Sequence, residues 1–187
     1  DDIFYIDLDP GSILTLRASG DVYVTERTGD INLGTIYSQS GSVNLVADGS
    51  IVDGLNHDYA NIAANTEINL TAINGSVGEL GVDAIETDLS SSAFITASAK
   101  GNIVLKELVG NMNVNVVSAG GDVDLWAHQA ILDVRDSDGS TVAAPKTGND
   151  SSLALADVIG ENVTLYSETS TIGLSGNDLD ITVNAGL

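Results

Sequence analysis

Oxygen ligands for a metal ion gather in one acidic stretch of the chain. Four aspartates lie in it or beside it: Asp133, Asp136, Asp138 and Asp150. Hard cations such as Ca²⁺ prefer carboxylate oxygens, so this stretch predicts a calcium site, with Ca²⁺ as the only cofactor that the sequence suggests. The stretch is not an EF-hand, because the glycine stands at the wrong place and no glutamate follows at the twelfth position. A solvated loop without an ion is the simpler alternative.

A second group of polar and aromatic residues falls on outward positions of successive predicted strands. Its members are Asn44, Glu67, Phe94, Asp122 and Asp124. Asp122 and Asp124 are two positions apart in a strand and therefore share a face. If the strands stack, the group predicts one elongated face that binds a polysaccharide or a protein. A solvated sheet face with polar ladders is the alternative.

The remaining residue types exclude several kinds of chemistry. The chain has no cysteine, and His57 and His128 have no second histidine at ligand spacing, which argues against a zinc site. Trp126 alternates with Leu125 and is expected outside or at a corner, where it could stack on a sugar. The formal net charge of -21 argues against binding to nucleic acids or to anionic lipid surfaces.

A long repeat organises the sequence. Gly20-Asp21-Val22-Tyr23-Val24 returns as Gly101-Asn102-Ile103-Val104-Leu105, a shift of 81 positions (from 20 to 101). Gly41-Ser42-Val43-Asn44-Leu45 returns as Gly121-Asp122-Val123-Asp124-Leu125, a shift of 80 positions (from 41 to 121). Regular repeats of this kind are typical of stacked, quasi-one-dimensional folds, which favours a structural or adhesive protein over a catalytic domain.

Strand signals dominate and helix signals are almost missing. Short segments alternate apolar with polar residues, and Gly, Asn, Asp and Ser separate them. Grouping the segments in threes predicts an all-β fold: a parallel β-helix of about six three-strand coils, right-handed by the crossover rule. The strand-start glycines are expected at corners with positive φ. An antiparallel β-sandwich is the competing fold.

The alternation also predicts which residues point inward and how the chain is divided. Residues 1–187 form a single β-helix segment with two three-coil super-repeats, about 12–92 and 93–187, and a loop insertion at about 135–152. The residues expected to stack inside are Leu14, Leu16, Val43, Leu45, Ile68, Leu70, Ile95, Ala97, Val123, Leu125, Val163 and Leu165.

Recurring phrases give the chain a family resemblance. Ala18-Ser19-Gly20-Asp21-Val22, Ala99-Lys100-Gly101-Asn102-Ile103 and Ala119-Gly120-Gly121-Asp122-Val123 are examples. They resemble those of large bacterial surface and secreted repeat proteins of the filamentous-haemagglutinin-like adhesin type. The resemblance implies an extracellular or cell-surface location, a long rod, and a host or neighbouring-cell surface protein or polysaccharide as partner. It implies no catalytic residues.

These observations together predict a non-catalytic, structural or adhesive β-helix segment of an exported bacterial surface protein, mediating adhesion or cell–cell contact. Because the chain begins and ends inside the pattern, we expect it to be a piece of a longer protein. Two alternatives stay open: a calcium-dependent carbohydrate-binding module and a polysaccharide-active β-helix enzyme, a lyase or a hydrolase. The six scattered cationic residues, with none expected opposite Asp122 and Asp124, argue against a lyase. No nucleic-acid partner and no membrane insertion of this segment are expected.

Overall fold

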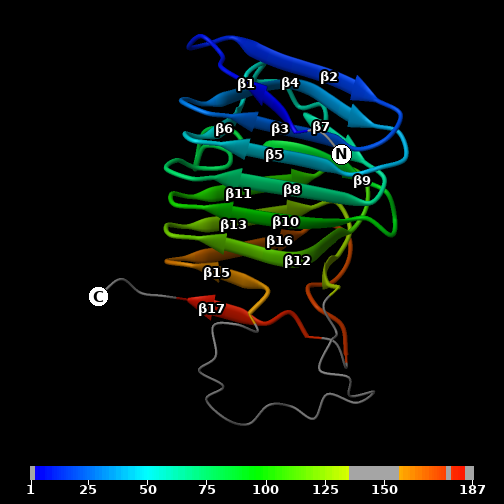
Figure 1. Cartoon of the computed structure of the whole chain (residues 1–187). Helices are drawn as coiled ribbons and strands as arrows, with labels where there is room; N and C mark the ends of the chain where they lie inside the picture. Colours follow the sequence, from blue (N-terminus) through cyan, green and yellow to red (C-terminus); the bar gives the residue numbers. More distant parts are fainter. Residues whose placement is uncertain (1–2, 135–155, 176–177, 184–187) are drawn as a thin grey trace.

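The computed structural model describes residues 3–134, 156–175 and 178–183. In these ranges the regular secondary structure is β-strand throughout, and every ladder between named strands is parallel. The strands stack into a solenoid of about seven turns, close to the six predicted (Figure 1). The predicted parallel β-helix is therefore confirmed.

The strands form two sheets, which we name A and B. Sheet A has nine strands: β1 (Phe4–Ile6), β3 (Val22–Glu26), β5 (Val43–Ala47), β8 (Glu67–Ala72), β10 (Phe94–Ala99), β12 (Met112–Ala119), β14 (Ile131–Asp133), β15 (Val158–Gly160) and β17 (Ile181–Val183). Sheet B has eight strands: β2 (Ile13–Ala18), β4 (Ile31–Ser38), β6 (Ile51–Asp53), β7 (Ile62–Ala64), β9 (Ile85–Leu89), β11 (Ile103–Glu107), β13 (Val123–Ala127) and β16 (Val163–Ser167). Along the chain the two sheets alternate, except that β6 and β7 both lie in sheet B and β14 and β15 both lie in sheet A.

The coils are divided differently from the predicted groups of three. Val22 of β3 pairs with Val43 of β5, and one sheet B strand, β4, lies between them in the chain. A turn of the solenoid therefore crosses each sheet once. In one turn a loop splits the passage through sheet B into β6 and β7, which both pair with the long strand β4, so three strands make one turn there. Elsewhere three successive strands, such as β10, β11 and β12, make one and a half turns.

The long repeat relates the two sheets to each other. Val22 and Ile103 occupy equivalent places in the repeat, yet Val22 lies in sheet A and Ile103 in sheet B. The same holds for Val43 and Val123. The repeated phrase thus encodes half a turn, a corner followed by a strand, and either sheet can use it.

Aliphatic side chains fill the interior, as the alternation predicts. In β5 and β13 the first, third and fifth residues are buried, and the second and fourth face outward. Leu45 pairs with Leu70, and Leu105 with Leu125, so like residues stack from rung to rung. Burying each such side chain stabilises the fold by roughly 1.5–3 kcal/mol relative to exposure. Of the residues predicted inside, Leu16, Val163 and Leu165 are only partly buried, and the others are buried.

Polar residues in the repeated phrase hold the corners together. The Oδ1 atom of Asn102 accepts a hydrogen bond from the backbone N–H of Asp122, 2.8 Å away. One rung earlier, the Ser76 hydroxyl oxygen accepts from the N–H of Asn102 at 3.0 Å. One rung later, Asp122 Oδ1 accepts from the N–H of Asn162 at 3.1 Å. These side chains satisfy corner N–H groups, so the polar position of the phrase has a structural role.

Close packing involves three glycines of the repeated phrase, Gly41, Gly101 and Gly121, and the prediction of positive φ was wrong for every phrase glycine. Among the described glycines a positive φ occurs only at positions 11, 78, 81 and 173, outside the phrase glycines that were predicted to have it. A Cβ atom on Gly101 would overlap the Ser76 hydroxyl oxygen of the previous rung. Gly101 is needed because the corner polar side chain of one rung occupies the space where the next rung would carry a Cβ.

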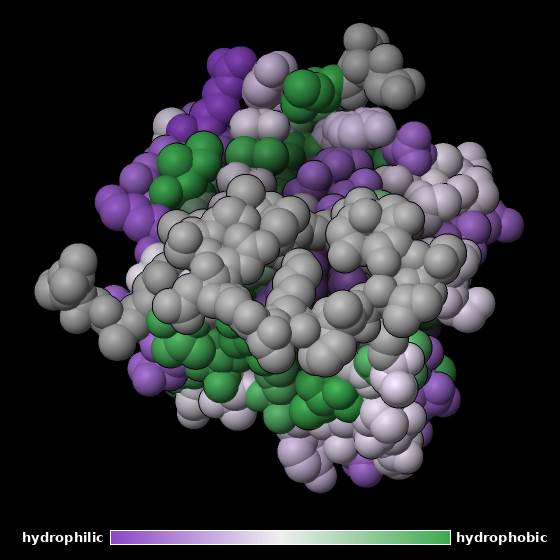
Figure 2. All heavy atoms as spheres, turned by 90° about the horizontal axis from the view of Figure 1, so that it is seen from below, coloured by the Kyte–Doolittle hydropathy of each residue, from purple (hydrophilic) through white to green (hydrophobic). Residues whose placement is uncertain are grey.

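The end of the solenoid that carries β17 exposes apolar side chains. Figure 2 views the molecule from this end, where hydrophobic and hydrophilic side chains both reach the surface. Ile172, Leu174, Ile181 and Val183 are all exposed. β17 pairs with β15 alone among the described strands, which explains why its side chains are less covered than those of inner rungs. In the part of the chain described, no helix has the length and apolarity needed to cross a membrane.

Candidate functional site

Three large side chains form one row on the outer face of sheet B. Lys106 of β11 pairs with Trp126 of β13, and Trp126 pairs with Tyr166 of β16. The chain neighbours Leu105 and Leu125 are buried, so strand alternation places the row on the outside. We refer to Lys106, Trp126 and Tyr166 as the sheet B row.

The members of the sheet B row contact one another along the rungs. The Lys106 Nζ atom lies 5.4 Å from the centroid of the Trp126 ring, within range of a cation–π interaction. The rings of Trp126 and Tyr166 are nearly parallel, with an interplanar angle of 18° and centroids 6.3 Å apart. Farther along the face, His128 Nδ1 lies 2.8 Å from a carboxylate oxygen of Glu168. The row therefore presents an apolar aromatic surface bordered by charged groups.

An open pocket of about 370 Å³ adjoins the row. It is lined by Ala84, Val104, Leu105, Lys106, Asp124 and Trp126. Desolvation by burial raises the pKa of the Asp124 carboxyl above its ordinary value. Apolar walls with one ammonium group and one carboxyl group can hold a small polar molecule that has an apolar face, such as a sugar ring.

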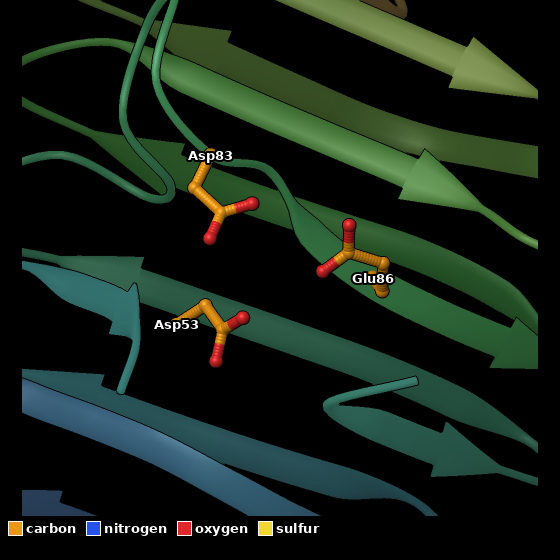
Figure 3. A group of neighbouring side chains, drawn as sticks. All are labelled: Asp53, Asp83 and Glu86. Carbon is orange, nitrogen blue, oxygen red and sulfur yellow. The ribbon is translucent and has the colours of Figure 1, made fainter. Parts of the chain in front are cut away.

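A cluster of three carboxyl groups lies on the same sheet. The acidic cluster consists of Asp53, at the end of β6, Asp83, just before β9, and Glu86, in β9 (Figure 3). One oxygen from each residue lies within 4.8 Å of the others. Two loops, 54–61 and 78–84, interrupt sheet B in successive turns and bring these residues together.

Burial and mutual repulsion dominate the electrostatics of the cluster. Glu86 is 2 % exposed, and desolvation, followed by the nearby charge of Asp83, raises its pKa to about 7. Lys106 opposes this shift, with its Nζ atom 3.9 Å from Glu86 Oε1 and also 3.9 Å from the exposed carboxylate of Asp58. The pKa of Asp83 is raised by desolvation and then by Asp53. The cluster thus holds more negative charge than Lys106 can balance, and carboxylate oxygens are ligands for hard cations.

The predicted calcium residues mostly fall outside the described part of the chain. Asp136, Asp138 and Asp150 lie in the range 135–155, and only Asp133, the last residue of β14, is described. Asp133 pairs with Val114 across sheet A. That calcium site therefore stays a prediction.

The predicted ligand face is divided between two sheets, which corrects the expectation of one continuous face. Asn44, Glu67 and Phe94 lie on sheet A, where Phe94 pairs with Glu67. Asp124 lies on sheet B, and Asp122 directly precedes β13. The expectation failed because equivalent strands of the repeat belong to opposite sheets. In addition, the Asp122 carboxylate accepts hydrogen bonds from the backbone N–H and from the side-chain amide of Asn162, and so it stabilises a corner of the solenoid.

Sequence reasoning missed the acidic cluster and the place of Lys106. The sequence predicts one loop insertion, at about 135–152, whereas loops 54–61 and 78–84 are shorter insertions at the same side of two successive turns. Aligning the half-turns would have shown both insertions and the carboxylates beside them. No cation was expected beside Asp124, yet Lys106 lines the same pocket.

No known protein provides evidence on the fold or the site of this chain. Comparison with known protein families, with curated proteins and with solved structures found no match for this chain.

Proposed function

We propose that this chain is a structural and adhesive β-helix segment of an exported bacterial surface protein, and that the outer face of sheet B binds a neutral polysaccharide. The location follows from the resemblance of its repeated phrases to adhesin-type surface proteins. The polysaccharide would belong to a host or neighbouring cell. The segment acts without catalysis, as a rigid support that presents the binding face.

The observation that carries this proposal is the sheet B row. Trp126 and Tyr166 lie in register on adjacent strands with nearly parallel rings, and Tyr166 is 52 % exposed. Sugar rings pack their apolar faces against aromatic side chains, and regularly spaced aromatic residues suit an extended chain of sugars. Because Lys106 and Asp124 line the adjoining pocket, they can bind sugar hydroxyl groups there.

Charge decides which class of polysaccharide fits. The protein carries a formal net charge of -21, and Lys106 is already shared between two carboxylates. Anionic polysaccharides would be repelled over most of the surface. Neutral polysaccharides avoid this repulsion and can still use the aromatic row.

Binding to immobilised neutral polysaccharides tests the proposal. A panel of β-glucan, mannan and galactan gels, read by affinity electrophoresis, would show retardation of the wild-type chain by at least one member. Trp126→Ala and Tyr166→Ala are expected to lose this retardation. Tyr5→Ala is the matched control, since Tyr5 is 53 % exposed but lies on sheet A. Equal loss in the control, or no retardation of the wild type by any polysaccharide, would contradict the proposal.

A polysaccharide-active enzyme is the second candidate, and one observation favours it. Lys106 and Asp124, a basic and an acidic side chain, line the same pocket beside an aromatic ring. Desolvation raises the pKa of the Asp124 carboxyl group, and a raised pKa favours a carboxyl group as a proton donor. Release of reducing ends from neutral polysaccharides, or of unsaturated products from acidic ones, would support this reading. If the wild-type protein binds a polysaccharide without any turnover, the result favours the adhesive function.

A further inference from the structure

We propose that Asp53, Asp83 and Glu86 bind one Ca²⁺ ion. The site is separate from the predicted calcium stretch around Asp136 and Asp138. It does not depend on the proposed polysaccharide, because it rests only on the acidic cluster.

The spacing of the three carboxyl groups suits a single ion. One oxygen of each lies within 4.8 Å of the others. Calcium binds oxygen at about 2.3–2.6 Å, so two ligands on opposite sides of the ion are up to roughly 5 Å apart. Figure 3 shows the three side chains converging on one space from β6, from the loop before β9 and from β9 itself. All three oxygens can therefore reach a common centre.

One carboxylate oxygen of the cluster is buried and lacks a hydrogen-bond partner. Glu86 is 2 % exposed, and its Oε2 atom is buried without any hydrogen-bond partner. Buried polar atoms almost always have a partner, and an uncompensated carboxylate oxygen is especially costly. The ion pair with the Lys106 ammonium group involves the other oxygen, Oε1, at 3.9 Å. A cation among the three carboxyl groups would supply the missing partner.

The ligands are held in place by the backbone around them. The Asp53 carboxylate accepts hydrogen bonds from the N–H groups of Leu55 and His57, at 2.8 and 3.0 Å. The N–H of Glu86 donates to the side-chain oxygen of Asn61, which is fully buried. Asp83 ends a tight turn in which its backbone exchanges hydrogen bonds with Glu79. Binding of an ion therefore requires little further ordering of the segments that carry the three carboxyl groups.

The type of ligand atom in the cluster favours one class of metal ion. All three ligand atoms are carboxylate oxygens, and no histidine or cysteine side chain belongs to the cluster. Such a set suits Ca²⁺ over Zn²⁺ or Cu²⁺. Mg²⁺ demands nearly ideal octahedral geometry and keeps most of its water, whereas Ca²⁺ accepts irregular ligand arrangements. Ca²⁺ is therefore the ion expected.

Calorimetric titration of the chelated full chain with CaCl₂ tests the proposal, with MgCl₂ and NaCl at matched ionic strength as references. We expect one Ca²⁺ per chain with a Kd at or below about 1 mM, and an affinity at least about 10-fold weaker in Asp83→Asn and in Glu86→Gln. Asp58→Asn is the matched control, since Asp58 also lies near Lys106 but its side chain is 97 % exposed and outside the cluster. It should stay within about 3-fold of the wild type.

Two results would overturn the site. One is wild-type protein that takes up no Ca²⁺ beyond the Mg²⁺ and NaCl references. The other is Ca²⁺ binding that persists in Asp83→Asn and Glu86→Gln but disappears in an Asp136→Asn/Asp138→Asn double variant. Far-UV circular dichroism of each variant establishes that a lost affinity is not lost folding, and the wild-type titration decides the first result without any variant.

Discussion

Lys106 and Glu86 lie side by side on the neighbouring strands β11 and β9, with Lys106 Nζ 3.9 Å from Glu86 Oε1. The same lysine reaches the Trp126 ring on its other side. Lys106 thereby links the acidic cluster to the sheet B row. It compensates a buried carboxyl group and borders the aromatic surface at the same time.

Removing the Lys106 charge is expected to destabilise the protein. Lys106→Met keeps the apolar length of the side chain but leaves Glu86 and its neighbours without their cation, so the free energy of unfolding should fall by about 1–2 kcal/mol without added calcium. Urea unfolding at neutral pH and low salt measures the change. Lys100→Met, at an exposed position, should change stability by less than about 0.5 kcal/mol. Equal effects of the two substitutions would show that only net charge matters.

Two glycines of the repeated phrase should respond differently to the same substitution. A Cβ on Gly101 would overlap the Ser76 hydroxyl oxygen, whereas a Cβ on Gly110 would meet no atom within 4 Å. Gly101→Ala is therefore expected to lower the free energy of unfolding by about 1–3 kcal/mol. Gly110→Ala should be neutral, or stabilising by up to about 1 kcal/mol, because it restricts the unfolded chain. Thermal unfolding of the pair gives the comparison, and equal losses would refute the close-packing explanation.

Corner hydrogen bonds should carry measurable stability. Asn102→Ala removes the acceptor of the Asp122 N–H group and is expected to cost about 1 kcal/mol. Asn74→Ala removes an exposed side-chain contact with Asp48 and should cost less than about 0.5 kcal/mol. Denaturant midpoints of both variants test this. An Asn102→Ala variant as stable as the wild type would mean that water replaces the lost acceptor.

The stability of the protein should depend on pH through Glu107. This side chain is fully buried at the end of β11, and desolvation raises its pKa to about 7 from an ordinary value of 4.5, against the opposing hydrogen bond from Thr87. Because the folded-state pKa is raised, the stabilising effect of the neutral form is complete below about pH 4.5. It is lost as the pH rises through about 7, by up to roughly 3 kcal/mol.

Glu107→Gln isolates this contribution. Glutamine stays neutral, so the decline in unfolding free energy between pH 4.5 and 7 should be shallower in the variant than in the wild type. The variant should also be less stable at low pH, because one of its amide hydrogens would face the N–H donors of Leu89 or Gly110. Asp88→Asn, at an exposed position of β9, controls for the change in net charge. Parallel pH curves for the wild type and Glu107→Gln would contradict the assignment.

Local pattern was enough to predict the class of fold and most of its interior. In β5 and β13 the alternation of apolar and polar residues decides which side chains are buried, since a strand turns successive side chains to opposite faces. It could not assign strands to turns, because grouping the segments in threes does not hold everywhere. The three strands β10, β11 and β12 cross the two sheets one and a half times, so the next group begins on the opposite sheet. The predicted ligand face therefore passes from sheet A at Phe94 to sheet B at Asp124.

The sequence by itself determined that this chain is a parallel β-helix with an aliphatic core and polar corners. Those properties depend on neighbours a few positions apart, and the repeated phrase records them. Only the tertiary structure decided which outer residues share a face, because the register between turns depends on loop lengths that differ from one turn to the next. Asp53 and Glu86 are far apart in the chain, and only the stacking of two interrupted turns brings their carboxyl groups together. The same stacking aligns Lys106, Trp126 and Tyr166, because hydrogen bonding between adjacent strands fixes which rungs meet.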